Sequence, residues 1–236
     1  MKFSLIIPCY NEALNLPLLF NRLKEFSNVE NIEVIIVDNG STDNSIEKLE
    51  QFAKKYSFIN CIRIEKNQGY GNGILEGLKS ASGQILSWTH ADMQTDPKDV
   101  LEGMKIINEK AKPEKIFIKG KRFGRPILDV FFTVGMSLFE SVLLKKIMWD
   151  INAQPTIFHR DFFNQWKMPP KDFSLDLYAY FMAKKYRLKI IKFPVRFAKR
   201  AYGVSHWNVN IIGKLRFIRR TLAYSFELQK RMKKNA

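Results

Sequence analysis

The chain has 236 residues, 46% of them hydrophobic, and its 39 Lys and Arg against 23 Asp and Glu give a formal net charge of +16. This length fits one domain with at most a terminal extension, and the apolar content excludes a disordered chain. The charge predicts an anionic partner, which nucleic acid, an anionic membrane surface or a phosphorylated substrate would each satisfy.

Strands and helices alternate through the first half of the sequence. Short apolar runs bounded by turn residues predict buried strands, and apolar residues at helical spacing predict the helices between them. The predicted strands are 3–7, 32–37, 60–64, 85–88 and 115–120, and the predicted helices are 11–26, one ending near 56, 74–81 and 98–111. This alternation predicts an α/β fold with a mostly parallel central sheet.

The second half is less regular. The apolar segment 131–148 is interrupted by Glu140 and is too short to span a bilayer, so we expect a buried or interfacial helix. Residues 173–186 are predicted to form a helix and 189–197 a strand. Because no secretory leader is recognised in the first residues and no span of membrane length follows, we expect a cytoplasmic protein.

The tail from about residue 209 is predicted to be a basic amphipathic helix. Its apolar stripe is Ile211, Leu215, Ile218, Leu222 and Phe226, and Arg216, Arg219, Arg220 and Lys230 flank it. The stripe would either lie on an anionic membrane or pack on the rest of the domain.

Polar clusters follow four of the predicted strands, at 8–12, 38–43, 67–73 and 90–94. The carboxyl ends of parallel strands meet at one edge of a sheet, where ligands bind in open α/β folds. Four clusters at one edge therefore predict a ligand site.

The cluster after the strand 85–88 suits a metal. Asp92, Gln94 and His90 offer oxygen and imidazole donors in the turn before Asp96 and Pro97, which fit N-cap and N1 of the next helix. A divalent cation, Mg²⁺ or Mn²⁺, held with substrate phosphates is one interpretation, and a simple capped turn is the other.

The sequence does not support a glycine-rich dinucleotide or P-loop site, nor a zinc or redox site built from cysteines. Gly69 and Gly71 lack the third glycine of a dinucleotide fingerprint, because Ile74 stands in its place, and there is no P-loop Gly-Lys-Ser/Thr. The two cysteines, Cys9 and Cys61, have neither zinc nor redox spacing.

The clusters read Ile-Ile-Pro-Cys-Tyr-Asn-Glu, Val-Asp-Asn-Gly-Ser-Thr-Asp, Asn-Gln-Gly-Tyr-Gly-Asn-Gly and Ala-Asp-Met-Gln-Thr-Asp-Pro. In this order they resemble the family 2 glycosyltransferases of the GT-A fold. Residues 200–205, Arg-Ala-Tyr-Gly-Val-Ser, are similar to the Arg-x-x-Gly-x-Ser signature of the dolichyl-phosphate mannosyltransferase-like branch, so the resemblance covers 3–207. It implies a Rossmann-like nucleotide-binding half and a mostly parallel sheet flanked by helices.

The resemblance also implies roles for individual residues. The donor nucleotide would be held by Pro8, Tyr10, Glu12, Asp38, Asn67, Gly71 and Asp92, the metal by Asp92, Gln94 and His90, and the phosphates and acceptor by Arg122, Gln154, Arg200, Ser205 and His206. Asp92, Arg200 and Asp176 are the candidates for catalysis, because a cation and an arginine stabilise charge on a diphosphate leaving group. Tyr10 would instead be an ordinary core residue if it does not contact the base.

The sequence departs from the family pattern at two positions. His90 replaces the first carboxylate of Asp-x-Asp, and Asn39 replaces the second carboxylate of Asp-Asp-Gly. His90 is then a metal ligand, a hydrogen-bond donor to phosphate, or a plain loop residue.

At the acceptor end, Asp150, Gln154 and Asp176 are polar residues in apolar surroundings. Asp176 would be the general base for a hydroxyl acceptor, or would position a phosphate acceptor or the sugar, since a phosphate oxygen is already ionised. A carboxylate on a helix surface is the third possibility.

We therefore expect metal-assisted, inverting transfer from a nucleotide diphosphate sugar to a polyprenyl or dolichyl phosphate lipid at the cytoplasmic membrane face. Residues 1–97 would form the nucleotide-sugar half, 98–208 the acceptor half, and 209–236 the tail helix. Transfer to a glycan hydroxyl and a catalytically silent nucleotide-binding relative are the alternatives. A nucleic-acid-binding protein fits the charge but lacks the motifs of that class.

Overall fold

A computed structural model of the chain describes residues 1–203 and 211–234, except for the side chains of residues 128, 211–217 and 234. Seven strands in this part of the chain form one sheet, in the order β3-β2-β1-β4-β6-β5-β7. The strands are β1 (Phe3–Cys9), β2 (Ile32–Asn39), β3 (Ile59–Ile64), β4 (Ile85–Trp88), β5 (Ile116–Phe123), β6 (Thr156–His159) and β7 (Lys189–Arg196).

The sheet is parallel except at β6. β1 pairs in parallel with both β2 and β4, with Ile6 opposite Ile35 on one side and Trp88 on the other. β6 runs antiparallel to β4 and β5. The carboxyl ends of β1, β2 and β4 therefore lie side by side, as the alternation of elements predicted.

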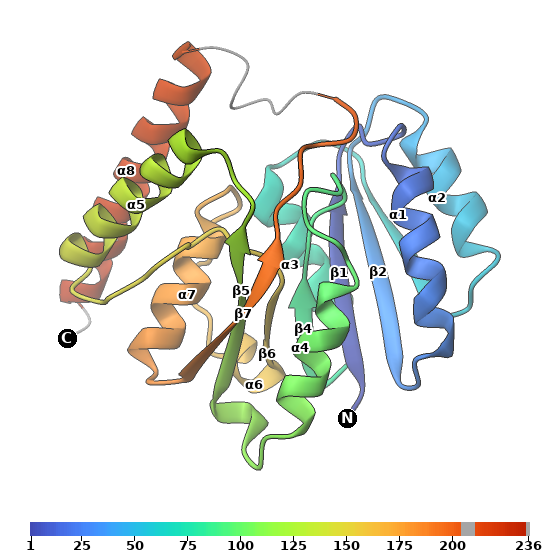
Figure 1. The fold of residues 1–236 in the computed structure, drawn as a ribbon, viewed down its shortest axis with the longest axis horizontal. Helices are drawn as coiled ribbons and strands as arrows, with labels where there is room; N and C mark the ends of the chain where they lie inside the picture. The colour runs from blue at the N-terminus through green and yellow to red at the C-terminus, as the bar shows by residue number, and fades with distance from the viewer. Residues whose placement is uncertain (204–210, 235–236) are drawn as a thin grey trace.

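Helices cover both faces of the sheet (Figure 1). Alternate residues of the central strands point to opposite faces and enter two hydrophobic cores. Leu5 and Val34 belong to the first core, and Ile6 and Ile35 belong to the second core. One face carries α1 (Leu16–Leu23), η1 (Lys24–Asn28), α2 (Ser45–Ala53) and α4 (Asp99–Asn108), and the other carries α3 (Tyr70–Ser80), α6 (Arg160–Asn164) and α7 (Leu175–Lys185). A short helix, η2 (Pro113–Lys115), precedes β5.

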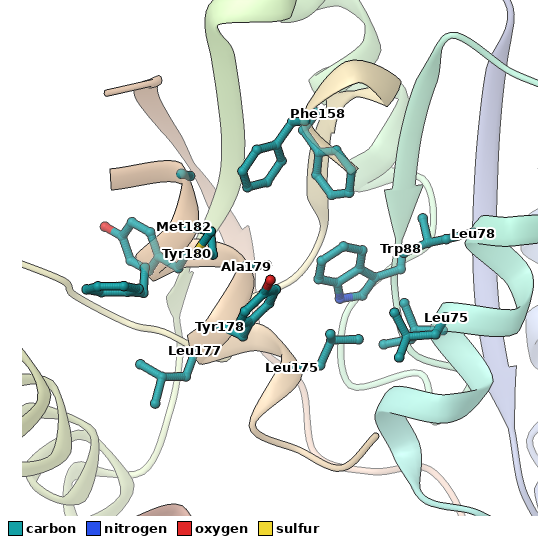
Figure 2. Packing of buried hydrophobic residues seen from close by; sticks show 14 of the residues in the cluster. Leu75, Leu78, Trp88, Phe158, Leu175, Leu177, Tyr178, Ala179, Tyr180 and Met182 are labelled. Carbon is teal, nitrogen blue, oxygen red and sulfur yellow. The ribbon is translucent and has the colours of Figure 1, made fainter. Parts of the chain in front are cut away.

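Trp88 is central to the second core. It is fully buried at the end of β4. Figure 2 shows its indole between Leu75 and Leu78 of α3 and the α7 residues Leu175 and Tyr178. This packing fixes the end of β4, from which the predicted metal turn follows.

α5 (Ile127–Leu143) and α8 (Ile211–Lys234) lie side by side at one end of the molecule (Figure 1). Tyr224 and Leu228 of α8 are buried in the second core. Ser225 Oγ donates a hydrogen bond to Glu140 Oε1 of α5 at 2.6 Å. The tail helix therefore packs on the domain through these residues.

The buried face of α8 is offset from the predicted apolar stripe. Ile218 and Leu222 are half-buried and Phe226 is 54% exposed, while the stripe's earlier side chains lie outside the described residues. The reason is that polar Ser225 belongs to the buried face, and a search for apolar spacing passes over it. None of the helices among the described residues is long and apolar enough to cross a membrane.

Several helix starts differ from the prediction. α1 begins at Leu16 rather than at Asn11, whose φ of 53° lies in the left-handed region. α3 begins at Tyr70 and takes in Gly71 and Gly73, which the sequence assigned to a loop. α4 begins at Asp99 rather than at Pro97, because Asp96 Oδ1 accepts from Lys98 N at 3.0 Å in a turn that precedes the helix.

Candidate functional site

A cavity of about 760 Å³ lies at the carboxyl edge of β1, β2 and β4 and extends to α5 and the segment 197–203. Most of the candidate residues line it: Pro8, Tyr10, Glu12, Asn67, His90, Asp92, Gln94, Arg122, Gln154, Asp176 and Arg200. Asp38 and Gly71 are buried nearby and do not line it. Ser205 and His206 lie outside the described residues.

The turn after β4 presents Asp92 to the cavity. Met93 takes a left-handed conformation, with φ at 59°, and Gln94 N donates to Asp92 Oδ1 at 3.1 Å. The bond holds the half-buried carboxylate in place and engages only one of its two oxygens.

Asp92, Gln94 and His90 line the cavity together, so it offers a carboxylate, an amide oxygen and an imidazole from one turn. Among the described residues, no group of three or more His, Cys, Asp or Glu side chains is placed to hold a metal alone. This donor set fits a hard divalent cation that takes its remaining ligands from a diphosphate and water.

His90 is the end member of a stack of three rings. Its ring lies 5.2 Å from that of Tyr70, which lies 4.6 Å from that of Phe173, with interplanar angles of 21° and 8°. The stack fixes the plane of the imidazole, so its nitrogens can act only along the ring edge. This geometry is compatible with a ligand to metal and with a donor to phosphate.

Glu12 and Arg200, which the sequence assigned to different parts of the ligand, form an ion pair in the structure. Asn15 Nδ2 donates to Glu12 Oε2 at 2.5 Å and to Tyr202 O at 3.2 Å. Burial and the carboxylate of Asp92 raise the pKa of Glu12, although Asn15 and Arg200 oppose the shift. These contacts hold the segment 200–202 against the residues that follow β1.

Asp38 lies at the end of β2 and is 1% exposed. Ser41 N donates to its Oδ1 at 3.3 Å, and its Oδ2 has no hydrogen-bond partner among the described residues. The adjacent Asn39 does line the cavity, and its Nδ2 donates to Gly69 O at 2.9 Å.

Gly71 allows a close approach between two segments. A Cβ at this position would lie 2.6 Å from Asp172 O and 2.8 Å from Lys171 C. Asn72 N also donates to Lys171 O at 2.8 Å. The glycine therefore lets α3 start against the segment 170–172, of which Asp172 lines the cavity.

Two arginines at the end of β5 share one buried carboxylate. Asp150 is 3% exposed and accepts from Arg122 N and Nε, both at 2.8 Å, while Arg125 Nη1 lies 3.8 Å from its Oδ1. Burial favours a higher pKa for Asp150, but the ion pair and hydrogen bonds from Arg122 outweigh it and hold the pKa below its usual value. Both arginines line the cavity, so its wall carries two guanidinium groups here.

Arg125 was missed by the sequence reasoning. Its guanidinium and that of Arg122 lie 5.5 and 5.2 Å from the ring centre of Phe197, and its Nη1 donates to Thr133 Oγ1 of α5 at 2.8 Å. The spacing of two arginines around Gly124, at the end of a strand, was the available signal.

Asp176 is in the first turn of α7, 2% exposed, so the interpretation as a helix-surface carboxylate is wrong. Its Oδ1 accepts from Gln154 Nε2 at 2.7 Å and from Trp88 Nε1 at 3.2 Å. The carboxylate is therefore held at a fixed place in the cavity wall.

Comparison with known proteins identifies relatives of the chain. Residues 4–166 match the family model described as Glycosyl transferase family 2. Over 240 residues, 99% of this chain and 67% of the relative, the chain is 29% identical to a dolichol-phosphate mannosyltransferase of Pyrococcus furiosus. It is 32% identical, over 46% of its length and 34% of the relative, to an undecaprenyl-phosphate 4-deoxy-4-formamido-L-arabinose transferase of Yersinia enterocolitica.

Solved structures share the fold. A glucosyl-3-phosphoglycerate synthase of Mycobacterium tuberculosis, in complex with Mn²⁺, UDP and glucosyl-3-phosphoglycerate, aligns with a TM-score of 0.74 at 13% identity, over 97% of this chain and 79% of that chain. A mannosyltransferase of Pyrobaculum calidifontis, in complex with GDP-Man and Mn²⁺, aligns at 0.64 and 17% identity, over 86% of this chain and 58% of that chain. This chain thus spans about two thirds of the Pyrococcus relative and a third of the Yersinia relative.

Proposed function

Because the chain belongs to glycosyl transferase family 2, we propose that it transfers a sugar from a nucleotide diphosphate sugar to a polyprenyl phosphate-type lipid. The proposal rests mainly on one observation, the lining of a single cavity. The turn with Asp92 lines one part of it, and Arg122 and Arg125 line another part, next to the apolar helix α5. The names of the Pyrococcus and Yersinia relatives describe this type of acceptor.

The donor nucleotide would occupy the end of the cavity formed after β1 and β2. Tyr10 is half-exposed there and offers a flat apolar surface to a base. Asp38 does not line the cavity, so the adjacent Asn39, which does and whose Oδ1 has no partner among the described residues, would accept from a ring N–H of the base.

A divalent cation would be held by Asp92 and Gln94, with His90 beside them. When bound, it supplies positive charge that stabilises the diphosphate as a leaving group. The two solved relatives contain Mn²⁺ beside UDP or GDP-Man, which supports the same requirement here.

Arg200 would add positive charge at the diphosphate by leaving its ion pair with Glu12 and binding the diphosphate instead. In the described structure it pairs with Glu12, and a diphosphate offers a stronger, bidentate acceptor. The exchange leaves Glu12 free to accept a hydrogen bond from a ribose hydroxyl.

The acceptor phosphate would bind Arg122 and Arg125. One of its oxygens attacks the anomeric carbon of the sugar, the bond to the β-phosphate oxygen breaks, and the nucleoside diphosphate leaves; this single displacement inverts the anomeric configuration. The attacking oxygen is already ionised near neutral pH, so no general base is required. Asp176 would then orient the sugar or the acceptor.

An exposed apolar face of α5 favours a lipid over a glycan acceptor. Ile127, Phe131, Leu138 and Val142 recur at helical spacing and are 64–73% exposed. Thr133 and Met136 of the same helix line the cavity. A lipid chain lying along α5 would therefore place its phosphate at Arg122 and Arg125. A polar glycan would not be stabilised by contact with this apolar face.

A thermal-shift panel tests the donor. UDP- and GDP-sugars, each with and without Mn²⁺, should include one nucleotide that raises the melting temperature more strongly with Mn²⁺, because ligand binding stabilises the folded state. A panel without any shift, combined with salt-dependent DNA binding, would reject the proposal and favour a nucleic-acid-binding protein.

A further inference from the structure

Lys119 of β5 is a fully buried lysine that does not line the cavity. Its register partner on β6 is Thr156, and its Nζ donates to Thr156 Oγ1 at 2.9 Å. The ring of Tyr180 lies 5.8 Å from Nζ. Burying an ammonium group is costly, so a fully buried lysine on β5 calls for a role.

The hydrogen bonds of Lys119 lead to Asp176. Thr156 Oγ1 donates to Gln154 Oε1 at 3.3 Å, and Gln154 Nε2 donates to Asp176 Oδ1 at 2.7 Å. Lys119, Thr156, Gln154 and Asp176 are each between 0% and 2% exposed. They form one buried relay from the sheet to the cavity wall.

The two end groups, the ammonium of Lys119 and the carboxylate of Asp176, determine which atom donates in each hydrogen bond of the relay. An ammonium group only donates, so Thr156 accepts from Lys119 and must turn its own proton towards Gln154 Oε1. That choice directs the amide nitrogen of Gln154 to the carboxylate. The reversed amide would place its carbonyl oxygen against Asp176, where two acceptors repel each other.

We propose that Lys119 is a positioning residue that, through Thr156, fixes the amide orientation of Gln154 and so keeps the carboxylate of Asp176 aimed into the cavity. Lys119 itself touches no substrate. The orientation of the Gln154 amide is inferred from these contacts alone, while its importance for catalysis rests on the proposed function.

The relay should be directional at neutral pH. Burial lowers the pKa of Lys119 to about 8, an effect that Lys192 and Arg122 reinforce and that Asp176 and Asp150 oppose. Below that pH the amine is the charged, donor-only group that the direction requires. The phenol of Tyr180 is the other titratable group packed against it.

A pair of substitutions at Thr156 tests the relay with little change in shape. Thr156→Val removes the hydroxyl and Thr156→Ser keeps it. The readout is the position of the Trp88 indole N–H signal in a nitrogen-15 NMR spectrum, because Trp88 Nε1 donates to Asp176 Oδ1. The chain has four tryptophans, so Trp88→Phe assigns the signal.

Thr156→Val should move this signal away from its position in the unsubstituted protein at pH 7, because the released Gln154 amide no longer holds Asp176 Oδ1 against the indole N–H. Thr156→Ser should return the signal to its original position. The same signal position in the two variants would overturn the proposal.

Turnover gives the second readout. Lys119→Met should lower kcat about tenfold or more while the KM for the donor changes less than about twofold, since the donor end is untouched. Lys192→Met is the matched control, because Lys192 also lies over the Tyr180 ring, at 5.1 Å, and bonds to Trp149 O instead of the relay. A similar loss of kcat in this control would reject a specific role for Lys119.

The two proposals fail separately. The NMR measurement needs no substrate, so a signal moved by Thr156→Val and restored by Thr156→Ser, in a protein without transferase activity, would reject the proposed function and leave the relay intact. Transferase activity with an unmoved signal would reject the relay alone.

Discussion

The Asp92 side chain makes few contacts that stabilise the fold. A substitution that removes only its charge can therefore test its role. The only hydrogen bond found to its carboxylate among the described residues comes from Gln94 N. Asp92→Asn keeps an acceptor for that bond and removes the charge that would hold a cation. We expect Mn²⁺-dependent donor turnover to fall about 100-fold or more, with a melting temperature within about 2 °C.

Asp96→Asn is the matched control for this measurement. Asp96 is four residues further on, does not line the cavity and pairs with Arg22 at 3.3 Å. It should leave turnover unchanged. Full metal-dependent activity in Asp92→Asn would show that the cation is held elsewhere.

The sequence predicted those site residues whose role depends on a short local pattern. Asp92, Gln94 and Tyr10 follow strands that periodicity identifies, so they were placed at the correct edge. The pairing of Glu12 with Arg200 joins residues 188 positions apart, and only the folded chain brings them together. Arg125 was missed because its contact with Asp150, which Arg122 shares, is not encoded by local spacing.

At the scale of elements, the junction of α3 with the segment 170–172 depends on Gly71. Gly71→Ala would place a methyl group within 3 Å of backbone atoms of that segment, which cannot move aside cheaply. We expect the free energy of unfolding to fall by about 1 to 3 kcal/mol in urea denaturation.

Gly135 provides the comparison, because a Cβ there meets nothing within 4 Å on the exposed side of α5. Gly135→Ala should therefore stabilise the protein by about 0.5 to 1 kcal/mol, through helix propensity. Equal effects at the two positions would contradict the close approach at Gly71.

The packing of α5 on α8 contains a buried carboxylate with an unusual pKa. Glu140 is 1% exposed, its Oε2 has no partner among the described residues, and burial raises its pKa to about 7, although the bond from Ser225 opposes the shift. The folded state thus prefers the protonated form. Its stabilising effect is complete below the unfolded pKa of about 4.3 and is lost as the pH rises to about 7.

Glu140→Gln removes this titration while keeping a hydrogen-bonding side chain. The variant should match the unsubstituted protein in stability at pH 4 and exceed it by about 1 to 3 kcal/mol at pH 8. Parallel stability curves for the two proteins between these values would show that Glu140 remains ionised in the fold.

Element order was predictable from the sequence, and element boundaries were not. Periodicity identified β1, β2, β4 and α7 because each buries a continuous apolar run or face. The antiparallel β6 was missed because its four residues are fixed by pairing with distant β4 and β5.

At the scale of the whole molecule, the net charge of +16 and the exposed face of α5 favour docking on an anionic membrane. Phe131 is 70% exposed on that face. Phe131→Glu should weaken binding to anionic vesicles by about 10 to 100-fold in a flotation assay, because a buried aromatic side chain contributes about 1.5 to 3 kcal/mol.

Leu18→Glu on α1 controls for added negative charge, since Leu18 is also exposed, at 40%, and does not line the cavity. It should change vesicle binding only slightly. If both variants float equally well, the membrane contact is not on α5.

The most direct test of the account is to incubate the protein with Mn²⁺, the nucleotide sugar that raises its melting temperature, and a polyprenyl phosphate, and to analyse the lipid extract by mass spectrometry. We predict a new lipid whose mass equals the polyprenyl phosphate plus one sugar less water, formed together with the nucleoside diphosphate. Arg122→Ala with Arg125→Ala should abolish it while leaving the donor-induced thermal shift, because the two arginines lie at the acceptor end. Unmodified polyprenyl phosphate beside a sugar transferred to a glycan hydroxyl would contradict the account.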